Sequence, residues 1–276
     1  GGGYKNTIGK LDFQGNAQVN LAGDFNGYNI YGEAAYKLDS TKRFSASILS
    51  NASPAAYNHL LFQSNYVNYN WYNEASYATV KTNTLAATLE APSWVNVTAS
   101  ASTIKDFAYF TQNSETSLVT SRQSDEAVNH LKITASKNIP YHKFNFDIKA
   151  TYQNVSGAED VINVPAFLTR GSLYYTDRLF KNALFVQTGL TVNYFSKYHM
   201  NGYDPILSEF YVQNDAEFGN FPLLDFFVNL KVRQTRNFAK AEHFNSSLTG
   251  NNFYSAPGNP YRDFNIRFGV VWNFFL

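Results

Sequence analysis

The sequence contains no cysteine and few charged side chains. None of its 276 residues is Cys, and only 16% are Asp, Glu, Lys or Arg. The absence of cysteine excludes a disulfide framework and thiolate chemistry. Soluble domains usually carry about a quarter charged residues, so the charge content is unusual for a soluble protein.

Long apolar runs are also missing. No run of about 18 apolar residues occurs, which excludes a transmembrane helix. The formal net charge is +1, from 22 basic and 21 acidic residues. A nucleic-acid-binding protein would need a clustered basic face, so we expect no nucleic-acid partner. These absences do not argue against transmembrane strands, which are apolar only at alternate residues.

The sequence is rich in aromatic residues, which make up 17% of the chain. It also contains stretches in which apolar and polar residues alternate strictly. The clearest case is the last stretch, Tyr261 to Leu276. Successive side chains of a strand point to opposite faces, so this stretch has one apolar and one polar face. At roughly 9–11 tilted residues per crossing, it is long enough to span a bilayer core. We expect its membrane-facing side chains to be Phe264, Ile266, Phe268, Val270, Trp272 and Phe274.

The same alternation recurs along the chain, for example without exception from Leu11 to Leu21. It predicts an all-β protein, an antiparallel transmembrane β-barrel domain over residues 1–276 with about twelve strands. Counted back from the C-terminus, short and long connections alternate, and only the first hairpin departs from this order. Outer-membrane barrels have short periplasmic turns and long extracellular loops. The alternative, a soluble sandwich, gives no reason for such sorting.

The polar parity of these strands, meaning the alternate positions that form the polar face, carries charges of both signs. The residues that we predict to line a pore are Lys143, Asp147, Lys149, Arg170, Asp225, Lys231, Arg233 and Arg267. Charged side chains along a pore tune its ion selectivity. The alternative is that these residues pair across strands in a narrow or plugged barrel. The sequence leaves both open.

No catalytic site, metal site or cofactor is expected. Of the five histidines, only His130 and His243 lie in predicted strands, and neither has a serine and an acid at matching depth. A nucleophilic hydrolase needs such groups in contact. Asp24 begins a fragment of a calcium-loop pattern that lacks the closing acidic residue, so we interpret it as a turn.

The long loops are rich in aromatic residues. Tyr57, Phe62, Tyr66 and Tyr72 lie between Asn51 and Thr79, and further aromatics follow in later loops. Such loops can bind sugars, bind a partner protein or fold into the lumen, and the sequence does not choose among these. We also expect part of the first loop, Tyr66 to Tyr72, to extend the strand that follows it.

Several segments resemble one family. Phe180-Lys-Asn-Ala-Leu-Phe, Leu224-Asp-Phe-Phe-Val-Asn and Phe268-Gly-Val-Val-Trp-Asn-Phe are similar to segments of the putative-porin family of Bacteroidota outer membranes. The resemblance covers most of the chain. It implies a bacterial outer-membrane location and a passive channel without a catalytic motif. Members are usually longer, so it also implies that this chain is the C-terminal portion of a larger barrel. The strand near Lys10 would then pair with chain upstream of it.

Two functions remain open at this stage. The first is a porin-like channel for passive diffusion of small polar solutes. The second is a non-catalytic barrel subunit of a larger outer-membrane secretion or barrel-assembly complex. The expected partners are the lipid bilayer and lipopolysaccharide, and for the second function other outer-membrane proteins.

Overall fold

The computed structural model describes residues 1–22, 26–248 and 253–273. Within these ranges the fold is almost entirely β, apart from the one-turn helix α1 (Tyr57–Leu60) and the 3-10 turns η1 (Glu159–Val161) and η2 (Ser246–Leu248). None of the helices in the described ranges has the length and apolar character to cross a membrane. The expected Asp24 turn and the membrane-facing Phe274 lie outside the described residues.

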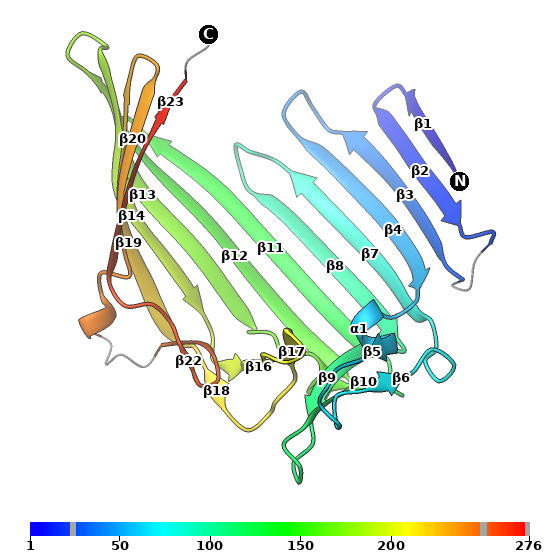
Figure 1. The fold of residues 1–276 in the computed structure, drawn as a ribbon. Coiled ribbons are helices and arrows are strands. Elements are labelled where there is room, and N and C mark those ends of the chain that lie inside the picture. Colours follow the sequence, from blue (N-terminus) through cyan, green and yellow to red (C-terminus); the bar gives the residue numbers. More distant parts are fainter. Residues whose placement is uncertain (23–25, 249–252, 274–276) are drawn as a thin grey trace. The chain divides into compact units, whose positions relative to one another are not determined.

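Thirteen strands form one large sheet in which each strand neighbours the next one along the chain (Figure 1). The strands are β1 (Gly2–Ile8), β2 (Leu11–Val19), β3 (Tyr28–Lys37), β4 (Arg43–Ser53), β7 (Val80–Glu90), β8 (Asn96–Lys105), β11 (Val128–Tyr141), β12 (Phe144–Gly157), β13 (Phe167–Leu179), β14 (Leu184–Phe195), β19 (Phe221–Val232), β20 (Thr235–Glu242) and β23 (Asn265–Trp272). The all-β, antiparallel part of the prediction is therefore confirmed, with thirteen strands in the sheet where about twelve were expected.

The strand that sequence reasoning missed is β1. It pairs antiparallel with β2 from Gly2↔Ala17 to Ile8↔Leu11. Its sequence, GGYKNTI, contains too few apolar residues to show alternation. Backbone hydrogen bonds to β2 define this strand, and these do not depend on side-chain polarity. The strand near Lys10 therefore pairs with Gly2–Ile8 inside this chain, and its expected pairing with strands of a larger barrel stays a prediction.

The chain divides into two compact units, which are described separately. Unit 1 comprises residues 1–134, 152–164 and 198–217. Unit 2 comprises residues 135–151, 165–197 and 218–276. The first contains β1 to β4, β7 and β8 with most of the loop structure, and the second contains β13, β14, β19, β20 and β23.

In unit 1 the apolar parity of the strands is exposed. Leu85 on β7 is 60% exposed and Ile48 on β4 is 58% exposed, and these two residues are register partners. The opposite parity carries polar cross-strand contacts, such as the 2.8 Å hydrogen bond between the hydroxyls of Thr84 and Ser102. In water such an apolar face would be covered, so its exposure favours contact with lipid.

Unit 2 shows the same division. The side chain of Phe264, directly before β23, and those of Ile266, Phe268, Val270 and Trp272 on it are between 51% and 83% exposed. On the other parity, the ring of Phe238 lies over its register partner Gly269, where a Cβ atom would come within 2.4 Å of the ring. The absence of a side chain at Gly269 therefore allows the aromatic ring to pack flat on the neighbouring strand.

The long loops contain ordered structure that the sequence did not predict. They hold β5 (Leu61–Phe62) and β6 (Trp71–Tyr72), β9 (Ala108–Gln112) and β10 (Val119–Gln123), β16 (Gly202–Asp204) and β17 (Glu209–Tyr211), and the short strands β15 (Tyr198–His199), β18 (Glu217–Phe218), β21 (Tyr254–Ala256) and β22 (Asn259–Pro260). The expected extension over Tyr66 to Tyr72 is wrong, because β6 pairs with β5 inside the loop and not with β7.

Candidate functional site

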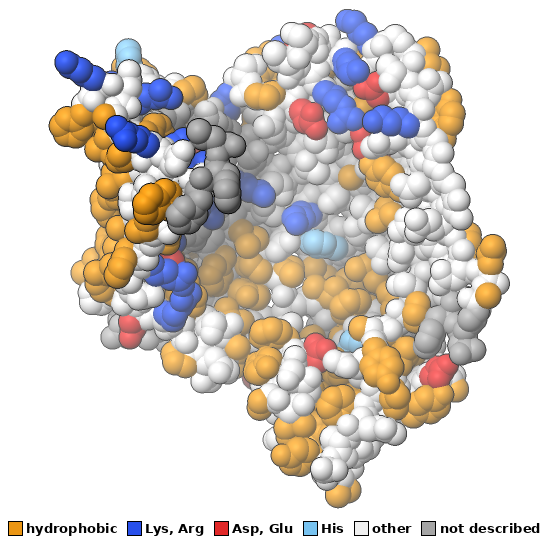
Figure 2. Space-filling view, turned by 45° about the horizontal axis from the view of Figure 1, so that its top comes forward, with side chains coloured by type: hydrophobic (Ala, Val, Ile, Leu, Met, Phe, Trp, Pro, Cys, Tyr) orange, Lys and Arg blue, Asp and Glu red, His pale blue; other side chains and the backbone are white. Residues whose placement is uncertain are grey.

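The polar face of unit 1 carries a chain of alternating charges near the short-turn end of its first strands. Lys37 Nζ lies 2.9 Å from Asp12 Oδ2. Arg43 links two carboxylates, with Nη2 2.6 Å from Glu33 Oε1 and Nη1 3.5 Å from Glu90 Oε1. Figure 2 shows basic and acidic side chains, in blue and red, gathered at the upper right of the view.

This network surrounds open space. A pocket of about 310 Å³ is lined by Lys5, Thr7, Asp12, Phe13, Gln14, Glu33, Lys37 and Arg43. The side-chain hydroxyl of Thr7 donates to Asp12 at 2.7 Å, and the Gln14 amide donates to Glu33 at 3.1 Å. Each acid is thus held by more than one donor. The face can contact a polar solute, while its own carboxylates are already neutralised.

Unit 2 contains all the residues predicted to line a pore, and Asp225 and Glu242 on its polar face are paired. Asp225 is only 9% exposed, and its Oδ2 lies 3.0 Å from Lys240 Nζ. Lys240 also contacts Glu242 at 3.0 Å, and Glu242 in turn accepts Arg267 Nε at 2.8 Å. Asp147 accepts a hydrogen bond from the amide of Asn138.

Four of the six predicted basic residues behave differently from Asp225 and Glu242. Lys149, Arg170, Lys231 and Arg233 are exposed. Within the described ranges none of the four forms an ion pair. These four bases outnumber Asp147 and Asp263, the acids of this face that form no ion pair in the described residues, so the face keeps an excess of positive charge. Such an excess attracts anions from solution.

Lys143 is the one predicted residue that turns away from this group. Its Nζ lies 2.6 Å from Asp177 Oδ2, and the hydroxyl of Tyr175 donates to the same oxygen at 2.6 Å. Tyr175 packs its ring against Phe144 at 5.4 Å, and both residues belong to the apolar parity of their strands. Because Lys143 directly follows the turn, its long side chain reaches the other side of the strand.

The second candidate region is formed by the loops of unit 1, residues 54–79, 106–127 and 198–217, here called the loop assembly. Its core consists of Tyr69, Phe110, Val119 and Leu207, which are at most 7% exposed. Phe62, Trp71, Leu118 and Tyr211 pack around them. Figure 1 shows α1, β5, β6, β9 and β10 grouped at the ends of β4, β7 and β8, and Figure 2 shows their hydrophobic side chains at the bottom of the view.

Polar contacts join the loops of the assembly. The Asn58 amide donates to Glu209 Oε1 at 2.8 Å, and the backbone N–H of Val212 donates to Phe110 at 2.8 Å. Asp204 accepts hydrogen bonds from Tyr69 and from the backbone of the β16–β17 turn. Hydrogen bonds of this kind fix one loop arrangement, because breaking any of them leaves a desolvated polar group without a partner.

His59 and Ser121 also meet in the loop assembly, with 2.9 Å between Nδ1 and Oγ. The His59 ring stacks on Phe110, with 4.1 Å between centroids, and Ser121 Oγ also bonds the hydroxyl of Tyr77 at 2.8 Å. Burial lowers the pKa of His59 below its ordinary value of 6.5. Sequence reasoning missed this pair, because both residues lie in loops whose contacts cannot be read from periodicity.

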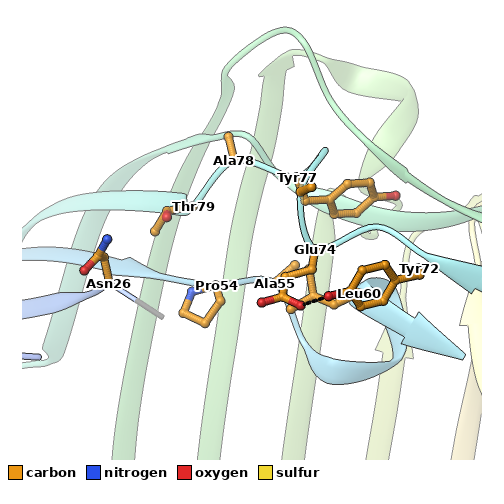
Figure 3. Close-up of a pocket in the computed structure, with 10 residues that line it drawn as sticks. Asn26, Pro54, Ala55, Leu60, Tyr72, Glu74, Tyr77, Ala78 and Thr79 are labelled. Carbon is orange, nitrogen blue, oxygen red and sulfur yellow. Dashed lines mark hydrogen bonds between the residues drawn. The ribbon is translucent and has the colours of Figure 1, made fainter. Parts of the chain in front are cut away.

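A pocket of about 420 Å³ opens beside the assembly, and Figure 3 shows its lining. Pro54, Ala55 and Leu60 supply apolar contacts, whereas Asn26 and Thr79 supply polar groups. The hydroxyl of Tyr72 donates to Glu74 at its wall. Within the described residues, no cluster of three or more histidine, aspartate or glutamate side chains is arranged to hold a metal ion.

Comparison with known families identifies the class of protein. The model of the family described as "Putative porin" matches residues 1–276, so the chain belongs to that family. With the exposed apolar strand faces and the polar faces opposite them, this places the chain in the bacterial outer membrane. No curated protein matches the chain.

Two solved structures have a similar fold. The FrpB iron transporter from Neisseria meningitidis (F3-3 variant) superposes with a TM-score of 0.60 at 14% identity, covering 97% of this chain and 44% of that one. The siderophore receptor PirA from Acinetobacter baumannii superposes with a TM-score of 0.58 at 9% identity, covering 94% of this chain and 45% of that one. The chain therefore spans less than half the length of these two proteins.

Proposed function

We propose that this chain forms part of an outer-membrane β-barrel through which small polar solutes diffuse passively, with anions preferred. The observation that carries the proposal is the uneven pairing of charges on the polar face of unit 2. Asp225 and Glu242 form ion pairs, while Lys149, Arg170, Lys231 and Arg233 have no ionic partner in the described residues. Basic side chains that line a pore favour anions.

The strand order and the length of the similar structures bear on the size of the complete barrel. The strand order of the sheet begins with β1 and ends with β23. The similar structures are more than twice as long as the matched region. We propose that this chain is the C-terminal portion of a longer barrel of the kind found in Bacteroidota. A larger number of strands gives a wider lumen.

We further propose that the protein has no catalytic role. The His59–Ser121 pair is the closest approach to a hydrolase constellation. However, the His59 ring stacks on Phe110 and Ser121 is shared with Tyr77. These contacts suit a packing role in the loop core, and a hydrolase would also need donors for an oxyanion.

The test is electrical. Purified full-length protein is inserted into a planar bilayer, and single-channel conductance and reversal potential are measured under a KCl gradient. We expect stepwise conductance and a reversal potential that indicates chloride preference. A silent bilayer, with other envelope proteins co-purifying in fixed ratio, would instead support the scaffold function.

A second measurement separates passive diffusion from energised transport. Solute-induced swelling of liposomes that contain only this protein requires no energy source. Swelling in small sugars and amino acids supports a passive channel. Uptake that occurs only in energised cells would contradict it.

A further inference from the structure

Two lysines face each other across neighbouring strands of unit 1. Lys81 on β7 is the register partner of Lys105 on β8, and both side chains are exposed. Like charges directly opposite each other destabilise a sheet. Within the described residues, neither lysine forms an ion pair that would offset this repulsion. A bound anion would turn the repulsion into attraction.

The lysine pair lies on the apolar parity, at the end of the strands that leads into the long loops. Alternation places Lys81 on the same face as Leu85, which is 60% exposed. At the other end of this face, the register aligns Tyr36, Phe44 and Leu89. The face is therefore apolar along most of its length and basic only at the long-loop end. Outer-membrane barrels turn that end to the outside.

Amide donors lie beside the lysines on the same face. Asn83 follows Lys81 by two residues, and its Oδ1 accepts the Ser50 hydroxyl at 2.7 Å. Asn129 on β11 accepts the Thr103 hydroxyl at 2.9 Å through its own Oδ1. In both cases the amide oxygen is occupied, so the NH₂ group of each side chain is the part left to bind a ligand.

The nearest acid in sequence does not neutralise the pair. Asp106 directly follows Lys105, but it lies beyond the end of β8 and lines a pocket together with Arg122 and Ser121. The outward cluster thus consists of two ammonium groups and two amide groups that all donate hydrogen bonds. A phosphate group, with its several acceptor oxygens and negative charge, is complementary to such a cluster.

We propose that Lys81, Lys105, Asn83 and Asn129 bind a phosphate of a lipid headgroup in the outer leaflet, that of lipopolysaccharide. A lipid is favoured over free phosphate because Leu85 and its partner Ile48, 60% and 58% exposed, continue the face toward the membrane interior. These side chains would contact acyl chains when the headgroup binds the lysines. The proposal rests on the membrane location and is independent of whether the protein conducts.

The test uses the full-length protein in neutral detergent micelles. Lipid A is titrated in, and bound lipid is counted by native mass spectrometry. The variant is Lys81→Gln with Lys105→Gln. The matched control is Lys10→Gln with Lys181→Gln, which removes the same charge from exposed short-turn residues. Each lysine near a membrane surface contributes about 1 kcal/mol to anionic lipid binding, so we expect a roughly 30-fold loss of affinity in the variant and none in the control.

Two further binding measurements identify the source of the phosphate. Dephosphorylated lipid A should bind the wild type as weakly as lipid A binds the lysine variant. Inorganic phosphate at the same phosphate concentration should not displace lipid A. Equal lipid A binding by variant, control and wild type would overturn the site. Displacement by inorganic phosphate would overturn its assignment to a lipid.

Discussion

The hydroxyl of Tyr69 donates a 2.8 Å hydrogen bond to Asp204 Oδ2, joining two buried residues that are 135 positions apart in the chain. Tyr69 lies in the first loop of the assembly and Asp204 in the last. The contact therefore connects loops that leave the sheet from different strands. The assembly depends on it because both groups are largely removed from solvent.

Tyr69→Phe should loosen the loop assembly. The substitution keeps the ring but leaves Asp204 without one of its donors in a buried position, which costs about 1–3 kcal/mol. We expect faster hydrogen exchange in residues 54–79 and 198–217, measured by mass spectrometry. Tyr72→Phe is the control, because it removes a hydroxyl bonded to Glu74 from a side chain that is 67% exposed. Equal exchange in the two variants would contradict a structural role for the Tyr69–Asp204 contact.

The loop assembly should also lose stability as the pH falls. Burial lowers the pKa of His59 below 6.5, so the unfolded loop binds a proton at a higher pH than the folded loop does. The stability from neutral His59 is fully present above pH 6.5 and is lost as the pH falls toward the lowered value. Hydrogen exchange of residues 54–79 should accelerate below about pH 6.5.

His59→Gln should reduce this pH dependence, whereas His142→Gln, at an exposed turn residue, should leave it unchanged. An identical pH profile for wild type and His59→Gln would show that another group is responsible.

Reversal of two available bases should change the ion preference. Lys149→Glu with Lys231→Glu lowers the net charge of the polar face of unit 2 by four. The reversal potential should therefore shift toward cation preference. The control is Lys10→Glu with Lys181→Glu, which makes the same change of charge in the short turns. A reversal potential that moves equally in both double variants would mean that Lys149 and Lys231 do not line the pore.

The two faces of a strand should differ in their tolerance of arginine. Val228 and Asn229 are neighbours on β19, and Asn229 donates to Gln187 at 3.1 Å on the polar face. Val228→Arg should cost about 2–4 kcal/mol near the bilayer midplane, whereas Asn229→Arg should cost far less. The measurement is urea-dependent folding into lipid vesicles. Similar costs would show that the lipid and polar faces have been interchanged.

Gly202→Ala should disrupt the β16–β17 hairpin. A Cβ atom at Gly202 would lie 2.2 Å from Cζ of its register partner Tyr211, so the ring must leave the assembly. Overpacking of this kind costs about 1–3 kcal/mol. Limited proteolysis should cleave residues 198–217 faster in this variant. Gly32→Ala is the control, since its Cβ would meet only Ile48, at 3.5 Å.

Sequence reasoning could predict the strands because their signal is local. In Leu11 to Leu21 or Phe264 to Trp272, apolar residues of the lipid face alternate with residues of the polar face. This alternation is missing where backbone pairing alone defines a strand, as in β1. It also fails at the turn-proximal Lys143, whose long side chain reaches Asp177 on the other side.

The loop assembly could not be predicted in the same way. Its contacts, such as Asn58 with Glu209, join residues 151 positions apart, and no periodicity connects them. The abundance of aromatic residues was the available signal. It indicated that the loops hold many large side chains, but not that Tyr69, Phe110, Val119 and Leu207 share one core.

That shared core has a consequence for how the surface can vary. A loop that packs only on itself can accept insertions or be exchanged without effect on its neighbours. Here Leu207 and Phe110 belong to different loops and to one core, so replacement of either loop would expose the other. Val67, 91% exposed, lies at a loop tip outside this core. Sequence change and the insertion of foreign peptides should therefore be tolerated at tips such as Val67 and rejected a few residues away, at Tyr69.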